Sequence, residues 1–483
     1  MRRPILKNYL TLTASSLGVW LAMFANRTII VRLAGAEALG LYQMVFPAYR
    51  LIAVIVTIGM PTVLTTLVAD YLARGAVEKA EQVRRIAATV ILILATVASI
   101  MLWSLREWLA SRFFADSRVA PALIFMPFAL IFSCEAAVLQ AYYHGCSNMK
   151  PYAISQTVEQ IVRIGMTWIL ISRFQTAPLQ AAAAMAASAA AEIAGFAALV
   201  LFRRIEKASV PCPHLSAPIR HTCKTQEPFS CLTHIQDAAP LLRGMIMLSL
   251  PLMLSGLIGS VLHMANVVIV PRRLFQCGYS MEQATRAMGE LFGMAQPIVF
   301  FPQVLVFPAA SALLPVISAA SGGDSHKKAD LSNKLRKAYH GAVALGVVSF
   351  VVLIAYGPQI AQALYGTAAA GKYIKILALA LPCAFTGAIS IAILNGLRKN
   401  TTVLAVSFVD ALVETALLYA LTHPHFGGLN GTVAATLAGW AFFAFISGAA
   451  AYLEYRKAFH HSPAWAAAAL RSSHKVMTDN PSP

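Results

Sequence analysis

The sequence alternates long apolar segments with short polar connections. Twelve apolar segments can be delimited, each near or above the ~20 residues that an α-helix needs to span a bilayer. They lie at about 8–33, 41–70, 85–105, 121–146, 151–172, 178–202, 242–270, 287–318, 339–357, 373–397, 402–421 and 430–452. The pattern predicts an all-α integral membrane protein with about 12 transmembrane helices.

The largest polar interruption divides these segments into two sets of six. We expect an N-terminal lobe at 1–202, a cytoplasmic linker at 203–241, a C-terminal lobe at 242–455 and a disordered cytoplasmic tail at 456–483. A weak internal repeat supports two lobes, because stretches beginning at Pro61 and Pro308 both reach a glycine fourteen residues later. Basic interfacial helices are expected to follow, at 76–85 and 325–337.

Composition and charge distribution agree with a membrane protein. The 483 residues are 58% hydrophobic and only 12% charged, whereas a soluble domain has about 25% charged residues. The net charge of +18 suggests nucleic acid, but 25 of the 38 Lys and Arg residues lie on the connections of one side, against 9 on the other. This asymmetry predicts no nucleic-acid partner, a multi-pass protein of the cytoplasmic membrane contacting membrane lipids, and both termini in the cytoplasm.

Three arginines lie in the first two apolar segments: Arg27, Arg32 and Arg50. A mid-bilayer arginine costs about 2.5–3.5 kcal/mol even on lenient scales, so we expect a wet, cationic cavity that receives an anion. Counted inward at 1.5 Å per residue, Arg27 and Arg50 both lie roughly 9–13 Å deep, and a short turn can place them side by side. Guanidinium suits bidentate phosphate contacts. The alternative is that these arginines snorkel to the outer headgroups.

Other charges lie inside the first lobe. Glu135 and Glu159 occupy the inner half of neighbouring segments, and Glu159 precedes Arg163 by four residues, which puts both on one helix face. These three residues form the expected cavity charge network. The alternative for Glu159 and Arg163 is a purely structural bridge.

Two acids lie four residues apart in the eleventh segment, Asp410 and Glu414, and no base on that helix neutralises them. Two such carboxylates share a proton or hold a cation, so we predict a coupling site for Na⁺ or H⁺, with the Thr436 hydroxyl as a further ligand. The alternative is that both turn toward the cavity with one acid protonated.

Signatures of catalysis are absent from the sequence, which contains no P-loop, Asp-x-Asp or Gly-x-Ser-x-Gly. We therefore expect no enzyme, no cofactor and no ATP-driven transport by this chain. The linker carries residues of the types that bind zinc, but their spacing matches no common finger, so a solvated linker is favoured over a metal site. These residues are Cys212, His214, Cys223, His221, Cys231 and His234.

Short motifs carry a resemblance to a known family. Leu33-Ala-Gly-Ala-Glu-Ala-Leu-Gly-Leu-Tyr, Phe46-Pro47 and Gly59-Met-Pro61 resemble the first hairpin of the stage V sporulation protein B group. That group belongs to the polysaccharide flippases of the multidrug/oligosaccharidyl-lipid/polysaccharide (MOP) exporter superfamily. Leu313-Leu-Pro-Val-Ile-Ser and Gly428-Leu-Asn-Gly-Thr-Val-Ala-Ala-Thr are similar to later motifs of the same family.

The resemblance implies two six-helix lobes, alternating access, and a lipid-linked glycan such as the undecaprenyl-pyrophosphate precursor lipid II as partner. Related MurJ-type flippases use arginines of the first two helices on pyrophosphate, and Arg27, Arg32 and Arg50 match those positions. They also have a cation site on the eleventh helix, which Asp410 and Glu414 resemble. Where they carry an arginine in the eighth helix, this chain has Gln296-Pro297.

These observations predict a lipid-linked oligosaccharide flippase for peptidoglycan or spore-wall synthesis, with cell-wall synthesis enzymes as candidate partners. A multidrug exporter of the same fold is the alternative, although it would favour acids for cationic drugs. A membrane glycosyltransferase or polymerase would need exposed catalytic acids, and the longest outer loop carries only Glu107 and Asp116. A scaffold for spore-coat or division proteins would not need buried arginines.

Overall fold

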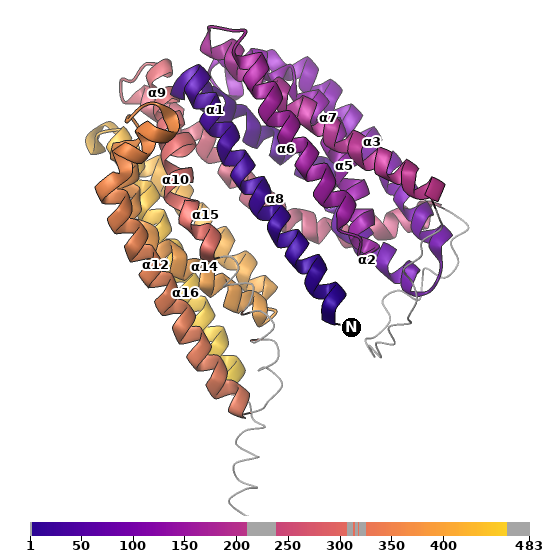
Figure 1. Cartoon of the computed structure of the whole chain (residues 1–483). Helices are drawn as coiled ribbons and strands as arrows, with labels where there is room; N and C mark the ends of the chain where they lie inside the picture. Colours follow the sequence, from indigo (N-terminus) through magenta and orange to yellow (C-terminus); the bar gives the residue numbers. More distant parts are fainter. Residues whose placement is uncertain (1, 210–237, 307–312, 314–316, 318–324, 461–483) are drawn as a thin grey trace, which may run out of the picture. The chain divides into compact units, whose positions relative to one another are not determined.

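The computed structural model describes residues 2–209, 238–306, 313, 317 and 325–460 (Figure 1). Every secondary-structure element in these ranges is helical, which confirms the predicted all-α fold. The longer elements are α1 (Arg2–Thr57), α2 (Met60–Ala73), α3 (Val77–Trp108), α5 (Met126–Gly145), α6 (Lys150–Ile171), α7 (Ala177–Ser209), α8 (Ala238–Gln276), α12 (Ser325–Tyr365), α14 (Leu381–Gly396), α15 (Asn400–Leu421) and α16 (Leu429–His460). Short pieces join them: η1 (Leu109–Phe113), η2 (Ser117–Val119), α4 (Ala120–Leu123), α9 (Met281–Met288), η4 (Gly289–Ala295), α10 (Gln296–Phe300), η5 (Phe301–Leu305), α13 (Gly371–Leu377), η6 (Ala378–Ala380) and η7 (Pro424–Phe426).

Within the part that the structure describes, seven helices are long and apolar enough to cross a membrane, or eight if one bent pair forms a single span. One of the seven, Gly18–Thr57, contains 40 residues and would be about 60 Å long if straight, twice the thickness of a bilayer core. It therefore contains parts of two of the predicted segments, 8–33 and 41–70.

The division of α1 occurs at Gly35, whose φ of 79° and ψ of −179° interrupt the helix. Only glycine adopts such a conformation without a steric penalty. Arg27 lies eight residues before Gly35 and Tyr42 seven residues after it, and in a straight helix they would be about 22 Å apart. Arg27 nevertheless lies within electrostatic range of Tyr42, so the chain folds back at Gly35, as the predicted turn requires.

The predicted segment 41–70 is not one helix. The chain breaks at Ile58 and Gly59, with φ of 50° and 67°, and α2 starts directly afterwards with Pro61 in its first turn. The left-handed glycine ends one helix, and the proline, which lacks an N–H, suits the start of the next. The apolar pattern alone does not contain this break.

The two expected basic helices are helical in the structure, and each leads directly into the following apolar segment. Residues 76–85 run directly into the third span as α3, and residues 325–337 run into α12. No glycine or proline lies between Val77 and Trp108, so nothing in the backbone ends the helix at the apolar boundary. By contrast, the proline-rich eighth segment is broken into α9, η4, α10 and η5 before the described part ends at residue 306.

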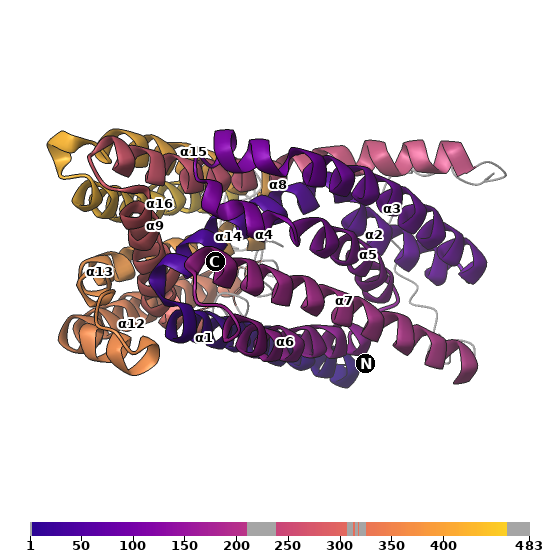
Figure 2. The same ribbon diagram turned by 90° about the horizontal axis from the view of Figure 1, so that it is seen from above.

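The chain forms two compact units. The first comprises Met1–Met294 with Ala361–Ala368; in it α6 and α7 lie side by side, α1 contacts both, and α5 packs between α3 and α7 (Figures 1 and 2). The second comprises Ala295–Ile360 with Ala369–Pro483, and there α16 packs against both α14 and α15. The lobe limits predicted at 203–241 stay a prediction, since residues 210–237 lie outside the described ranges.

Packing between α2 and α5 depends on Gly145. A Cβ atom there would lie 2.7 Å from Val68 Cβ and 2.8 Å from the Thr65 carbonyl oxygen, neither of which can rotate away. We predict that Gly145→Ala lowers the stability by about 1–3 kcal/mol because of overpacking. Thermal unfolding in detergent measures it. The control is Gly165→Ala on α6, where a Cβ meets nothing within 4 Å; an equal loss in both variants would contradict the packing argument.

Candidate functional site

A buried cluster of charges lies between α6 and α7. Arg163 Nη2 lies 2.5 Å from Glu159 Oε1 on its own helix and 3.4 Å from Glu192 Oε1 on α7. All three residues are less than 10% exposed. The predicted pairing of Glu159 with Arg163 is present in the structure, and Glu192 joins it as a second carboxylate. We call Glu159, Arg163 and Glu192 the α6–α7 charge cluster.

Hydroxyl groups of α1 extend this cluster. Tyr49 donates a hydrogen bond to Glu192 Oε1 (3.1 Å), and the Tyr42 hydroxyl lies 3.1 Å from Ser188 Oγ on α7. On α6, Gln156 Nε2 donates to Glu159 Oε2 (3.2 Å). Buried polar groups need such partners, so the second limb of α1 is held against α6 and α7 by hydrogen bonds as well as by apolar packing.

The charge cluster contains two carboxyl groups and one guanidinium, and Arg50 lies at its edge. The Arg50 side chain is exposed at the cluster's edge and lies within electrostatic range of Glu159. It forms no hydrogen bond or ion pair with another residue of the described ranges. The arrangement leaves the Arg50 guanidinium able to bind an anion.

Arg27 and Arg32 have different surroundings. Arg32 Nε donates to the Leu364 carbonyl oxygen (2.6 Å) and its Nη2 to the Ala363 carbonyl oxygen, so Arg32 caps the C-terminal end of α12. Arg27 is partly buried and lies near Tyr42 and Tyr365. Among the described residues it has no hydrogen-bond or ion-pair partner. Of these two arginines, Arg27 therefore keeps its donors for a ligand.

The depth of Arg27 and Arg50 below the membrane surface stays a prediction, whereas their positions along α1 relative to Gly35 are defined. Helix resumes directly after Gly35, so Arg27 lies about 12 Å and Arg50 about 22 Å from the turn along their limbs. The structure offers two separated cationic positions on one hairpin.

Glu135 lies apart from the α6–α7 charge cluster. It lines a pocket together with Glu81, Arg84 and Arg203, and its Oε1 atom is buried without a hydrogen-bond partner in the described part of the chain. The structure thus brings together Glu159 and Arg163 from the predicted cavity network but not Glu135.

The two acids of α15 belong to the second unit. Asp410 and Glu414 are partly buried, lie close enough for their charges to interact, and have no ion-pair partner among the described residues. Glu414 packs on α16, where a Cβ at Gly439 would lie 3.3 Å from Glu414 Cγ. The Thr436 hydroxyl donates to the Thr432 carbonyl oxygen (3.0 Å), so it is engaged within its own helix.

Metal ligation finds no support in the described ranges, where no group of three or more His, Cys, Asp or Glu side chains is placed to hold an ion. The Cys and His residues of the linker that were considered for zinc lie at 212–234, outside these ranges.

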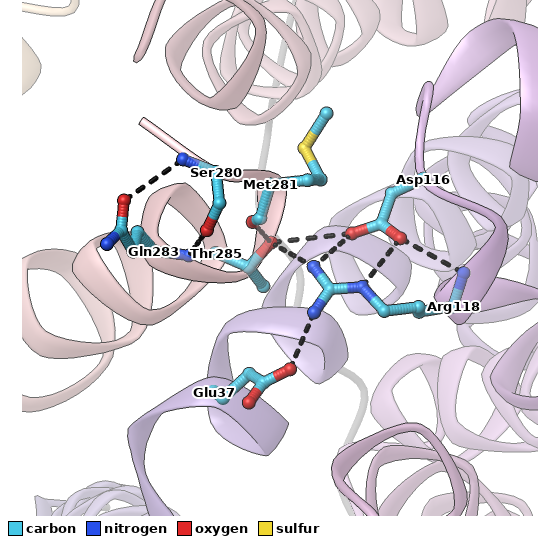
Figure 3. A network of polar contacts seen from close by, with 7 residues as sticks. All are labelled: Glu37, Asp116, Arg118, Ser280, Met281, Gln283 and Thr285. Atoms are coloured by element: carbon cyan, nitrogen blue, oxygen red, sulfur yellow. Dashed lines mark hydrogen bonds and ion pairs between the residues drawn. The ribbon is translucent and has the colours of Figure 1, made fainter. Parts of the chain in front are cut away.

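A second polar network, not predicted from the sequence, joins η2 to α1 and α9 (Figure 3). Arg118 donates from Nη1 to Glu37 Oε1 (2.6 Å), from Nε and Nη2 to Asp116 (2.9 and 2.7 Å), and from Nη2 to Thr285 Oγ1 (3.0 Å). Beside it, a Cβ at Gly289 would lie 1.9 Å from the Ala36 carbonyl oxygen. The sequence places the three connections that form this network on one side of the membrane. Arg118 is separated from Glu37 by 81 residues and from Thr285 by 167, so no local sequence pattern indicates these partners.

The α6–α7 charge cluster makes a stability prediction. Arg163→Met leaves two buried carboxylates without their cation, so we expect a loss of about 3–5 kcal/mol. Adding Glu159→Gln to this variant should restore part of the stability, because one buried charge is then removed. Thermal unfolding in detergent of the two single variants and the double variant measures this coupling. Additive losses would show that the residues do not interact.

Two comparisons of the sequence with known proteins give matches over more than half of the chain. The family of polysaccharide biosynthesis proteins matches residues 5–321. Stage V sporulation protein B of Bacillus subtilis (strain 168) is 27% identical over 438 residues, which are 90% of this chain and 81% of that protein.

Solved structures share the fold. A multidrug resistance MATE family transporter of the MOP superfamily, in its inward-facing conformation, gives a TM-score of 0.71 at 14% identity, covering 93% of this chain and 99% of the other. A MOP superfamily transporter from Pyrococcus furiosus gives 0.57 at 16% identity over 94% and 96% of the two chains. Because the family match covers more than half of the sequence, the chain belongs to the polysaccharide biosynthesis protein family, as a multi-pass membrane protein with the fold of MOP superfamily transporters.

Proposed function

We propose that this protein is a flippase that translocates an undecaprenyl-pyrophosphate-linked oligosaccharide across the cytoplasmic membrane by alternating access. Lipid II, for peptidoglycan or spore cortex, is the proposed substrate. Membership of the polysaccharide biosynthesis family and the similarity to stage V sporulation protein B support this choice. The single structural observation that carries it is Arg27, a partly buried guanidinium without a counter-charge among the described residues.

Arg27 fits the chemistry of a pyrophosphate. An unpaired cation in apolar surroundings is costly, and a bound anion removes that cost. Its neighbours Tyr42 and Tyr365 are neutral hydroxyl-bearing rings rather than carboxylates, so they leave the positive charge in place. A phosphate oxygen accepting two guanidinium N–H bonds would be oriented as well as held.

Arg50 and the α6–α7 charge cluster supply the second position. Arg50 is exposed and about 10 Å further along the hairpin than Arg27. In the proposed mechanism the phosphates engage one arginine and then the other, the sugars occupy a wet cavity, and the prenyl tail stays in lipid. Glu159 lies within electrostatic range of Arg50 but forms no ion pair with it, so the exposed guanidinium stays open to a ligand.

Asp410 and Glu414 are proposed as the site where Na⁺ or H⁺ binding resets the transporter. Like charges one helical turn apart on a partly buried face favour uptake of a cation. The same acids would suit a multidrug exporter, which shares the fold. In that alternative they would bind the drug, and Arg27 would have no role.

The first test concerns Arg27. In cells depleted of the native protein, the variant Arg27→Gln or the wild type is expressed, and lipid II exposed at the outer leaflet is measured. The variant should give at least about tenfold less exposure than wild type, since a charge-assisted hydrogen bond contributes about 1.5–3 kcal/mol. Arg27→Lys keeps the charge but not the fork geometry and should retain intermediate activity. The amount of each variant in the membrane is measured in parallel.

Arg32→Gln is the matched control, because Arg32 binds helix carbonyl groups. It should lower the unfolding temperature rather than the rate of flipping per folded molecule. Wild-type exposure of lipid II by Arg27→Gln, at wild-type abundance in the membrane, would contradict the proposed phosphate site.

The second test concerns coupling. Asp410→Asn combined with Glu414→Gln should abolish stimulation of transport by a Na⁺ or H⁺ gradient in proteoliposomes. The reason is that an amide takes up no proton near neutral pH and has no negative charge to attract a cation. Binding of substrate at equilibrium should stay within about twofold of wild type. Stimulation that persists in the double variant would place the coupling ion elsewhere.

A further inference from the structure

A pocket at one end of the first unit has a chemistry that the transport mechanism does not use. It has a volume of about 270 Å³, far above the roughly 10–15 Å³ needed to hold one water. Helices α3, α5 and α7 line it, and these helices lie side by side (Figures 1 and 2). The lining residues are Glu81, Arg84, Arg85, Glu135, Leu139, Phe196, Val200 and Arg203.

Three guanidinium groups in this pocket converge on one carboxylate. Arg84 donates from Nε and Nη2 to Glu81 (3.2 and 2.9 Å), Arg85 donates from Nε (3.3 Å), and Arg203 donates from Nη2. One carboxylate offsets one positive charge, and Glu135 can offset at most one more. The pocket therefore stays positive in every protonation state of its acids.

The arginines keep donors for a ligand. A guanidinium has five N–H donors, and Glu81 takes only one nitrogen from Arg85 and one from Arg203. Arg203 is also held in place, because its Cζ lies 5.6 Å from the centre of the Tyr142 ring. A fixed guanidinium with remaining donors binds phosphate at a lower entropic cost than a mobile one.

Part of the pocket lining is apolar. Leu139, Phe196 and Val200 line it, and the Phe196 ring packs against Phe132 in a tilted arrangement with 5.8 Å between the centroids. A free phosphate ion gains nothing from such a wall, whereas the glycerol and first acyl carbons of a lipid do. The combination of arginines and an apolar wall is that of a lipid-headgroup site.

We propose that this pocket binds the phosphate of an anionic glycerophospholipid of the membrane leaflet that faces the cytoplasm in the orientation predicted from the charge distribution. The phosphate lies against Arg84 and Arg203, and the glycerol and acyl carbons lie against Leu139, Phe196 and Val200. The bound lipid bridges α3 and α7 and neutralises their excess charge. The site does not depend on which glycan the protein transports.

The test uses native mass spectrometry of the full-length protein in mild detergent, titrated with phosphatidylglycerol and, separately, with phosphatidylcholine. Wild type should bind phosphatidylglycerol at least about tenfold more tightly. Arg84→Gln with Arg203→Gln should weaken that binding by about 30-fold, at roughly 1 kcal/mol per arginine. No headgroup preference in the wild type would overturn the proposal.

Arg106→Gln is the matched control, because Arg106 lies on the same helix 22 residues from Arg84, about 33 Å away and at the other membrane surface. It should leave binding unchanged, and an equal loss in this variant would overturn the site. Since Arg84 and Arg203 also bond to Glu81, Val200→Trp provides a second variant that fills the pocket without altering charge. This variant should lose the preference for phosphatidylglycerol over phosphatidylcholine, and wild-type binding of phosphatidylglycerol would contradict the assignment.

Competition separates the sources of phosphate. Inorganic phosphate at millimolar concentration should not displace phosphatidylglycerol, because it lacks the apolar contacts. Displacement by one equivalent of undecaprenyl phosphate would identify the transported lipid as the occupant and overturn the assignment to a resident phospholipid. Flipping activity is not the readout, so failure of this proposal and failure of the proposed transport function are distinguishable.

Discussion

The buried charge of Arg163 constrains the first unit more than any other single group. A guanidinium without a partner in apolar surroundings would cost several kcal/mol, and it cannot be neutralised by losing its proton. Glu159 supplies one carboxylate from the same helix, and Glu192 supplies another from α7. Because Tyr49 of α1 hydrogen-bonds to Glu192, satisfying one charge fixes the mutual positions of three helices.

The membrane arginines fall into two classes by what they contact. The charges of Arg163 and Arg32 are met by groups of the protein itself, carboxylates and helix carbonyl groups respectively. Arg27 has no such partner among the described residues, and Arg50 is exposed at the edge of the α6–α7 charge cluster. A structural charge is matched within the fold, whereas a charge that serves a ligand is left unmatched until the ligand arrives. This difference supports a cargo that carries negative charge.

Sequence reasoning succeeds where interactions are local. Apolar segment length predicted the all-α membrane fold, and the i,i+4 spacing predicted the pairing of Glu159 with Arg163. It failed for contacts between distant segments: nothing near Arg118 in the sequence indicates Glu37 or Thr285 as partners. It also missed the break at Ile58 and Gly59, where a left-handed backbone divides an apolar segment that has no polar interruption.

Helix α3 is longer than the membrane requires. Its 32 residues extend about 48 Å, against a hydrocarbon thickness of about 30 Å. Tilting alone would need an inclination of about 50°, beyond the 0–40° range of membrane helices. At least one end of this helix must therefore project into the headgroup layer. Because the apolar run starts at Ile86, the polar first turns are the end expected to project. A helix of this length would then hold Arg84 at the level of the lipid phosphates.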